Sequence, residues 1–102
     1  MNKALEGKIV SFKLNSGEEL IAKVTRIELS EVIISYPISV APGPKGLGLI
    51  PSFFTSEPKS EHRLNINSVA VYAETDVSVQ SKYTEATTGL VVPEKKLLHG
   101  IS

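Results

Sequence analysis

The stretch VSFKLNSGEELIAKV, residues 10–24, decides the fold of this chain. Apolar residues alternate with polar ones on both sides of a central turn: Val10, Phe12 and Leu14 before it, and Leu20, Ala22 and Val24 after it. A period of two is typical of half-buried strands. Between the two halves, Gly17 can adopt the positive φ that tight hairpins need. The stretch therefore predicts an antiparallel hairpin, which needs further strands or a partner subunit to be stable.

Composition narrows the class of protein. The chain has 102 residues, of which 41% are hydrophobic and 22% charged, as expected for one small folded domain. Lys and Arg number 11, as do Asp and Glu, so the net charge is zero. Tight non-specific binding to nucleic acid needs a clustered basic surface. Any such surface would have to be local, or assembled from several subunits.

Two further features bear on the compartment. The chain has no cysteine, which excludes disulfides and thiolate metal sites. Residues 1–8, MNKALEGK, lack the apolar segment of a signal peptide. The longest apolar runs fall far short of the roughly 20 residues that span a bilayer. We therefore expect a cytoplasmic protein without a membrane partner.

Alternating and β-branched segments predict five strands. They are residues 8–14, 18–28, 32–36, 47–54 and 64–73. Pro37 should end the third strand or place it at an edge, because proline donates no ladder hydrogen bond; residues 38–41 could continue it after a bend. Ile21 makes the second strand apolar on both faces, which indicates strong bending or burial on both sides. Short links between these strands predict a small, strongly bent, five-stranded antiparallel barrel, since closure removes exposed edges.

Two polar segments form loops in this scheme. Residues 42–48, PGPKGLG, place Lys45 at a loop tip, but the phosphate-loop pattern GxxxxGK[ST] is absent. Residues 55–63, TSEPKSEHR, form an exposed loop by composition. Its His62 has no second metal ligand at suitable spacing, so we expect no metal and no cofactor.

The ends of the chain leave alternatives open. Residues 1–7 form either one helical turn ended by Gly7 or a frayed terminus. In residues 76–88, Asp76 can cap a helix, and Val79, Tyr83 and Ala86 would share one face; the β-branched residues of the same segment favour a strand. The apolar residues 90–92 dock either on the domain itself or on a partner. We assign residues 1–93 to one domain with a C-terminal extension and residues 94–102 to a flexible tail.

The strand order and the hairpin resemble the Sm-like (Lsm) family. The first Sm motif is matched by Val10, Phe12, Leu14, Gly17, Leu20, Ala22, Val24 and Glu28. The outer positions of the second motif are matched within Leu64-Asn65-Ile66-Asn67-Ser68-Val69. The resemblance covers residues 5–73. In overall character the chain is most similar to the divergent Sm-like proteins of bacteriophages of marine cyanobacteria, which would place it in the cytoplasm of the host cell.

The resemblance implies a ring. Sm-like subunits pair the fourth strand of one copy with the fifth of the next, so the family implies a homo-oligomer between a pentamer and a heptamer, and we favour the pentamer. The family's RNA-binding pocket does not carry over. An Asn and an Arg-Gly pair form it in RNA-binding relatives, whereas Val32, Asn65 and Ile66 occupy these positions here. Asn65 keeps only part of the hydrogen bonding that Arg supplies.

Of three possible functions, we expect the first, and the second is the alternative. The first is RNA or single-stranded nucleic-acid binding by loop residues around the ring: Lys45, Lys59, His62, Arg63, Asn65 and Asn67. The second is a structural or adaptor ring in phage assembly or host takeover, with partner surfaces at Leu47, Leu49, Phe53, Phe54 and residues 90–92. The third is an enzyme, which we do not expect because the sequence carries no Ser-His-Asp set or paired-carboxylate motif.

Overall fold

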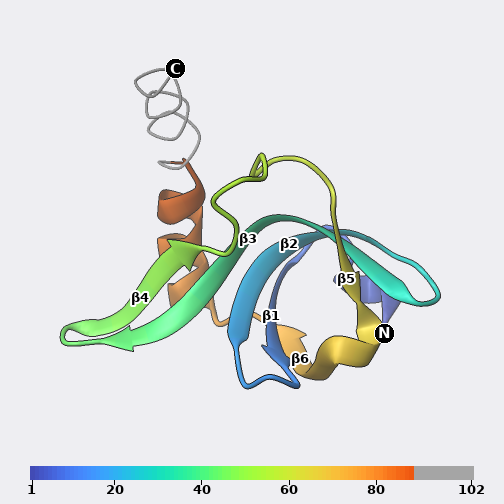
Figure 1. The fold of residues 1–102 in the computed structure, drawn as a ribbon, viewed down its shortest axis with the longest axis horizontal. Coiled ribbons are helices and arrows are strands. Elements are labelled where there is room, and N and C mark those ends of the chain that lie inside the picture. Colours follow the sequence, from blue (N-terminus) through green and yellow to red (C-terminus); the bar gives the residue numbers. More distant parts are fainter. Residues whose placement is uncertain (89–102) are drawn as a thin grey trace.

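Antiparallel strands make up most of the computed structural model, which describes residues 1–88 (Figure 1). In chain order the elements are the 3-10 turn η1 (Lys3–Leu5), β1 (Ile9–Leu14), β2 (Glu19–Ile27), β3 (Glu31–Gly43), β4 (Gly46–Pro51), β5 (His62–Asn65), the 3-10 turn η2 (Ile66–Ser68), β6 (Val69–Glu74) and a helix over residues 77–88. The six strands form one sheet in the order β4-β3-β2-β1-β6, and β5 pairs with β3. Figure 1 shows β1, β2, β3, β5 and β6 curving around a common interior.

The predicted hairpin is confirmed as β1 and β2. Val10 lies opposite Ala22 and Phe12 lies opposite Leu20 in an antiparallel register. Gly17 in the turn has a φ of 93°, in the left-handed region that favours glycine. The alternating residues of both strands are buried in one interior cluster, so the period of two in the sequence corresponds to the inner face of the sheet.

The prediction of a five-stranded antiparallel barrel is confirmed in part: the strands are antiparallel and form one sheet, but residues 1–88 contain six strands, and their pairing does not close the sheet. The predicted fifth strand is divided by η2, where the Asn65 side chain accepts a hydrogen bond from the Asn67 backbone N–H. As a result β5 pairs with β3, whereas β6 pairs with β1. Within residues 1–88, no ladder joins β5 to β6, so strand pairing alone does not close the sheet.

Pro37 does not end the third strand. Lys23 pairs with Ser35 and Ile21 pairs with Ile38, so Tyr36 and Pro37 together face one residue of β2. The extra residue creates a β-bulge. Proline has no backbone N–H to donate to the ladder, and a bulge is one of the positions where a strand tolerates it. Tyr36 there has a φ of 51°, and β3 continues beyond the bulge to Gly43. The fourth strand, predicted over residues 47–54 with an interruption near Pro51, ends at Pro51.

The helical alternative for residues 76–88 is confirmed, and it explains why β2 is apolar on both faces. Ile21 and Ile38 point away from the interior cluster and pack with Tyr83 of the helix in a second buried cluster. The backbone N–H of Ser78 donates to Asp76 Oδ2 at 3.1 Å, as expected of a helix cap. Gly89, the predicted helix stop, and the apolar residues 90–92 lie outside the described residues.

Two expectations for the rest of the chain can be compared directly. The N-terminal helical turn forms as η1, and Gly7 after it has a φ of 83°. Along the part of the chain that the structure describes, no helix is long and apolar enough to cross a membrane.

Candidate functional site

The residues predicted to contact nucleic acid are distributed over four elements. Lys45 lies in the turn between β3 and β4, and Lys59 lies in the loop between β4 and β5. His62, Arg63 and Asn65 belong to β5, and Asn67 belongs to η2. Several of the side chains already have partners within the domain, so each is described by its contacts.

Arg63 belongs to a network of exposed ion pairs. Its Nη1 lies 3.0 Å from Glu31 Oε1 and 3.5 Å from Glu28 Oε1. Arg26 lies 2.8 Å from a carboxylate oxygen of Glu61 and 2.9 Å from one of Glu28. The hydrogen bond from Arg26 holds the pKa of both Glu28 and Glu61 below the usual range. With two arginines and three glutamates, the network carries no excess of positive charge to attract phosphate groups.

The two asparagines stabilise the turn that divides β5 from β6. The Asn65 side chain caps η2, and its backbone oxygen accepts a hydrogen bond from Ser68 Oγ at 2.6 Å. The backbone oxygen of Asn67 accepts a hydrogen bond from Asn15 Nδ2 at 2.7 Å. The Asn65 side chain therefore stabilises the backbone turn, at the position that the resemblance aligns with the arginine of the family's base pocket.

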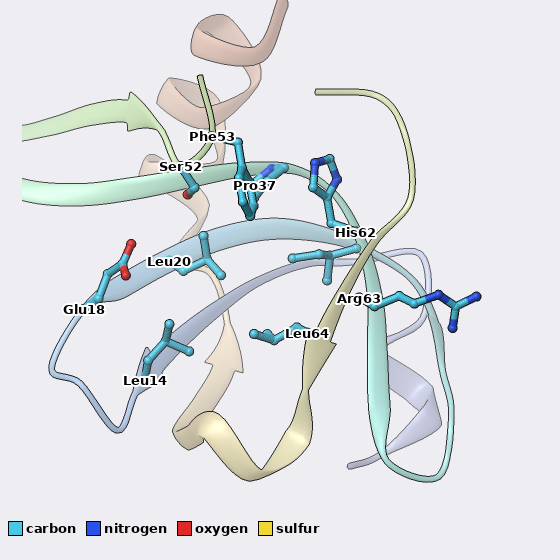
Figure 2. Close-up of a pocket in the computed structure, with 10 residues that line it drawn as sticks. Leu14, Glu18, Leu20, Pro37, Ser52, Phe53, His62, Arg63 and Leu64 are labelled. Carbon is cyan, nitrogen blue, oxygen red and sulfur yellow. The ribbon is translucent and has the colours of Figure 1, made fainter. Parts of the chain in front are cut away.

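His62 lies at a pocket that opens into the interior of the sheet (Figure 2). The pocket has a volume of about 410 Å³. Its floor is apolar and is formed by Leu14, Leu20, Ile34 and Leu64. Polar and aromatic side chains surround the opening: Glu18, Ser52, Phe53, His62 and Arg63. Figure 2 shows the Arg63 guanidinium turned away from the leucines of the floor, in keeping with its ion pairs to glutamates.

Phe53 and His62 form an aromatic pair at this opening. Their ring centroids are 5.3 Å apart and their planes are inclined by 28°, which is a stacked arrangement. His62 Nδ1 lies 2.9 Å from the Ser60 backbone oxygen, an acceptor, so Nδ1 carries a hydrogen. Nε2 lies 2.9 Å from Ser56 Oγ. Both ring nitrogens are thus fixed by the loop, and the orientation of the imidazole is set before any ligand arrives.

The loop over residues 52–61 is itself tied to β3 on both sides of the bulge. The Tyr36 N–H donates to the Pro58 oxygen at 2.7 Å, and the Ser52 N–H donates to the Pro37 oxygen at 3.1 Å. Both bonds are made by the backbone of the two bulge residues, Tyr36 and Pro37. The bulge therefore places the loop, and with it Phe53, over the opening.

One side of the opening is a polar wall. Ser39 Oγ donates to Glu18 Oε2 at 2.7 Å and lies 2.9 Å from Ser52 Oγ. Within residues 1–88, no Lys or Arg nitrogen lies within ion-pair distance of Glu18. Its carboxylate is exposed at the rim and is the negative group there that lacks an ion-pair partner.

Two strand edges form a second feature of the surface. β4 pairs only with β3 and β6 pairs only with β1, so each presents one free edge among the described strands. Both edges carry exposed apolar side chains: Leu47 is 54% exposed and Ile50 51% on β4, and Val71 is 63% exposed and Tyr72 39% on β6. Exposed edges of this kind are templates for pairing with another chain.

Sequence reasoning missed the pocket. It treated His62 as an exposed loop residue that could contact nucleic acid, and it treated Phe53 as part of a strand and of a partner surface. Among residues 1–88, no group of three metal-ligating side chains occurs. The available signal was an aromatic residue two positions after the strand-ending Pro51, and a histidine at the far end of the same loop.

Comparisons with known proteins add no assignment. No protein-family model and no curated protein matches this chain. Function must therefore be argued from the geometry.

Proposed function

We propose that the protein is an Sm-like β-barrel subunit that assembles into a homo-oligomeric ring and serves as a scaffold for protein interaction. The observation that carries this proposal is the pair of free edges. β4 and β6 have six residues each and lie at the two ends of the sheet. Pairing of β4 in one copy with β6 in the next joins two different surfaces, and such head-to-tail contacts close into rings when the rotation permits.

The exposed apolar residues support the same assembly. Leu47 and Ile50 on one edge and Val71 on the other are each more than half exposed in the single chain. Pairing of the edges would remove their apolar surface from water, at roughly 25 cal/mol for each Å² buried. Phe54, 77% exposed on the loop after β4, would remain outside the paired edges and available to a protein partner.

Cross-linking tests the edge pairing directly. The chain has no cysteine, so the variant Ile50→Cys with Val71→Cys places one thiol on each edge. A short bismaleimide should convert this double variant into a ladder of cross-linked species that ends at the ring. Each single variant should stop at dimers, because every copy then has one thiol. A double variant that yields no species beyond the dimer would contradict head-to-tail pairing.

Nucleic-acid binding is the second candidate. Lys45 and Lys59 favour it, because both lie in exposed loops and neither forms an ion pair among the described residues. A ring would repeat both charges in every subunit, so weak single contacts would act together. The ion pairs of Arg63 with Glu28 and Glu31 argue against nucleic-acid binding, because they neutralise its charge.

Binding of RNA and of single-stranded DNA at low and moderate salt separates the two candidates. The scaffold proposal expects no binding even at low salt. Binding that weakens steeply with salt, and that Lys45→Ala with Lys59→Ala abolishes, would establish the second candidate instead.

A further inference from the structure

We propose that the pocket under the Phe53–His62 pair binds a small planar aromatic cation. The flat ring would lie on the leucine floor beside Phe53, and the ammonium group would lie at the Glu18 carboxylate. This site is distinct from the strand edges, and it requires neither ring assembly nor nucleic acid.

The size and lining of the pocket match such a ligand. A volume of about 410 Å³ lies within the range of roughly 300–1,000 Å³ that is usual for small-molecule sites. Leu14 and Leu64 line the floor and are only partly buried, so the domain leaves apolar surface here that its own side chains do not cover. Removing that surface from water favours an apolar ring over a fully polar ligand.

The aromatic pair supplies the preference for a planar ring. Phe53 is 51% exposed although it is stacked on His62, so a large part of its ring remains accessible. Figure 2 places both rings above the leucines of the floor. The imidazole is held by the Ser60 and Ser56 contacts, so binding would not have to order it. A preorganised aromatic surface binds rings with little loss of conformational entropy.

The charge of the rim supplies the preference for a cation. Glu18 has no ion-pair partner in residues 1–88, whereas Arg63 is paired with two glutamates and turns outward. The hydrogen bond from Ser39 fixes the Glu18 carboxylate on the polar wall. An ammonium group above the apolar floor would therefore meet one positioned negative charge, and the aromatic faces beside it also favour a cation.

Three indole probes test the proposal. Tryptamine is cationic, indole is neutral and indole-3-acetate is anionic, and all three carry the same ring. The protein contains no tryptophan, so the indole fluorescence of the probe reports its binding without interference. We expect saturable binding of tryptamine, with indole-3-acetate bound at least tenfold more weakly, about 1.4 kcal/mol.

Variants assign the two parts of the site. Glu18→Gln keeps an oxygen that can accept from Ser39 but removes the charge, and it should abolish the difference between tryptamine and indole-3-acetate. Phe53→Ala should weaken tryptamine and indole alike. Phe54→Ala is the matched control, because Phe54 is an adjacent exposed phenylalanine outside the pocket lining, and it should change nothing.

Three results would overturn the proposal. They are the absence of saturable tryptamine binding at millimolar concentration, equal affinity for the cationic and the anionic probe, and equal effects of Phe53→Ala and Phe54→Ala. Glu18 and Phe53 are both exposed, so their replacement should leave the fold intact, and circular dichroism of each variant confirms this before binding is measured.

Discussion

Tyr83 holds the C-terminal helix on the sheet, and its replacement should release that helix alone. Its ring is 3% exposed and packs against Ile21 and Ile38. Its hydroxyl donates to the Tyr36 backbone oxygen at the bulge, at 2.7 Å. Tyr83→Phe removes this bond, and the net contribution of such a hydrogen bond to stability is about 0.5–1.5 kcal/mol. Tyr83→Ala also removes the ring, and loss of a buried aromatic side chain costs about 3–5 kcal/mol.

The helix has little stability of its own. Its described part covers the twelve residues 77–88, and isolated helical segments of this length are marginal in water. Once docking is lost, the helix itself should therefore unfold, while the strands around the interior cluster stay folded. The Tyr83→Phe substitution should raise the local opening of the segment about fivefold, and Tyr83→Ala should leave it open most of the time.

Hydrogen exchange read by mass spectrometry measures this opening segment by segment. We expect faster exchange in residues 77–88 and unchanged exchange in β1 and β2. Tyr72→Phe is the matched control, because Tyr72 lies on β6 and is 39% exposed. If Tyr83→Ala leaves the exchange of residues 77–88 as it is in the unchanged protein, the docking role of Tyr83 is refuted.

The same contact predicts a dependence on alkaline pH. Burial raises the pKa of the Tyr83 hydroxyl above its ordinary value. A raised pKa means that the native state favours the neutral phenol. The stability that the docked Tyr83 hydroxyl provides is therefore fully present below the ordinary tyrosine pKa of about 10. This stability should be lost as the pH rises above that value, and the hydrogen-exchange protection of residues 77–88 should then decrease in the unchanged protein. Tyr83→Phe has no hydroxyl to ionise there, so its protection should be unaffected by this titration.

Four other substitutions test separate parts of the structure. Val71→Lys on the β6 edge should reduce the oligomer mass measured by light scattering, whereas Val77→Lys, on the exposed side of the helix, should not. Gly17→Ala should lower the free energy of unfolding by about 1–2 kcal/mol in urea titrations, because the turn needs a positive φ; an unchanged midpoint would contradict this. Phe12→Ala should cost about 3–5 kcal/mol in the same assay, since the ring is fully buried. Arg26→Ala should make the free energy of unfolding less dependent on pH in the range where carboxylates are protonated. The pKa values of its partners Glu28 and Glu61 are lowered, so their ion pairs stabilise the native state above that range and are lost as the pH falls through it. An acid transition that is identical in both proteins would contradict this contribution.

The local pattern of the sequence was sufficient for the hairpin, whereas for residues 1–7 it left a helical turn and a frayed terminus as alternatives. Val10 and Phe12 alternate with polar residues, and a sheet with one buried face has no other way to place them. The capping side chain of Asp76 indicated where a helix could start, but the β-branched residues after it kept a strand as the alternative. Ile21 signalled burial on both faces of β2, but the sequence did not show that the covering element is a helix of the same chain.

The features that were missed depend on contacts between distant residues. The continuation of the third strand by residues 38–41 was one of two alternatives and is confirmed, but the bulge at Pro37 that permits it is visible only in the register of β2 against β3. The division of the predicted fifth strand follows from Asn65 capping its own turn, for which the sequence offered only polar residues within an apolar run. The Phe53–His62 pair lies in a loop that is tied to the bulge, so the occurrence of both residues in one loop of the sequence was not sufficient to predict the pocket.

The central claim is that the free edges of β4 and β6 join copies of this chain into a closed ring. Size-exclusion chromatography with multi-angle light scattering measures the mass in solution most directly. For five to seven copies of the 11.0 kDa chain, we predict a single species of about 55 to 77 kDa, five copies being the favoured number. The mass should be independent of protein concentration, as expected of a closed assembly. A monomer of 11.0 kDa at high protein concentration would contradict the ring and the scaffold function that rests on it.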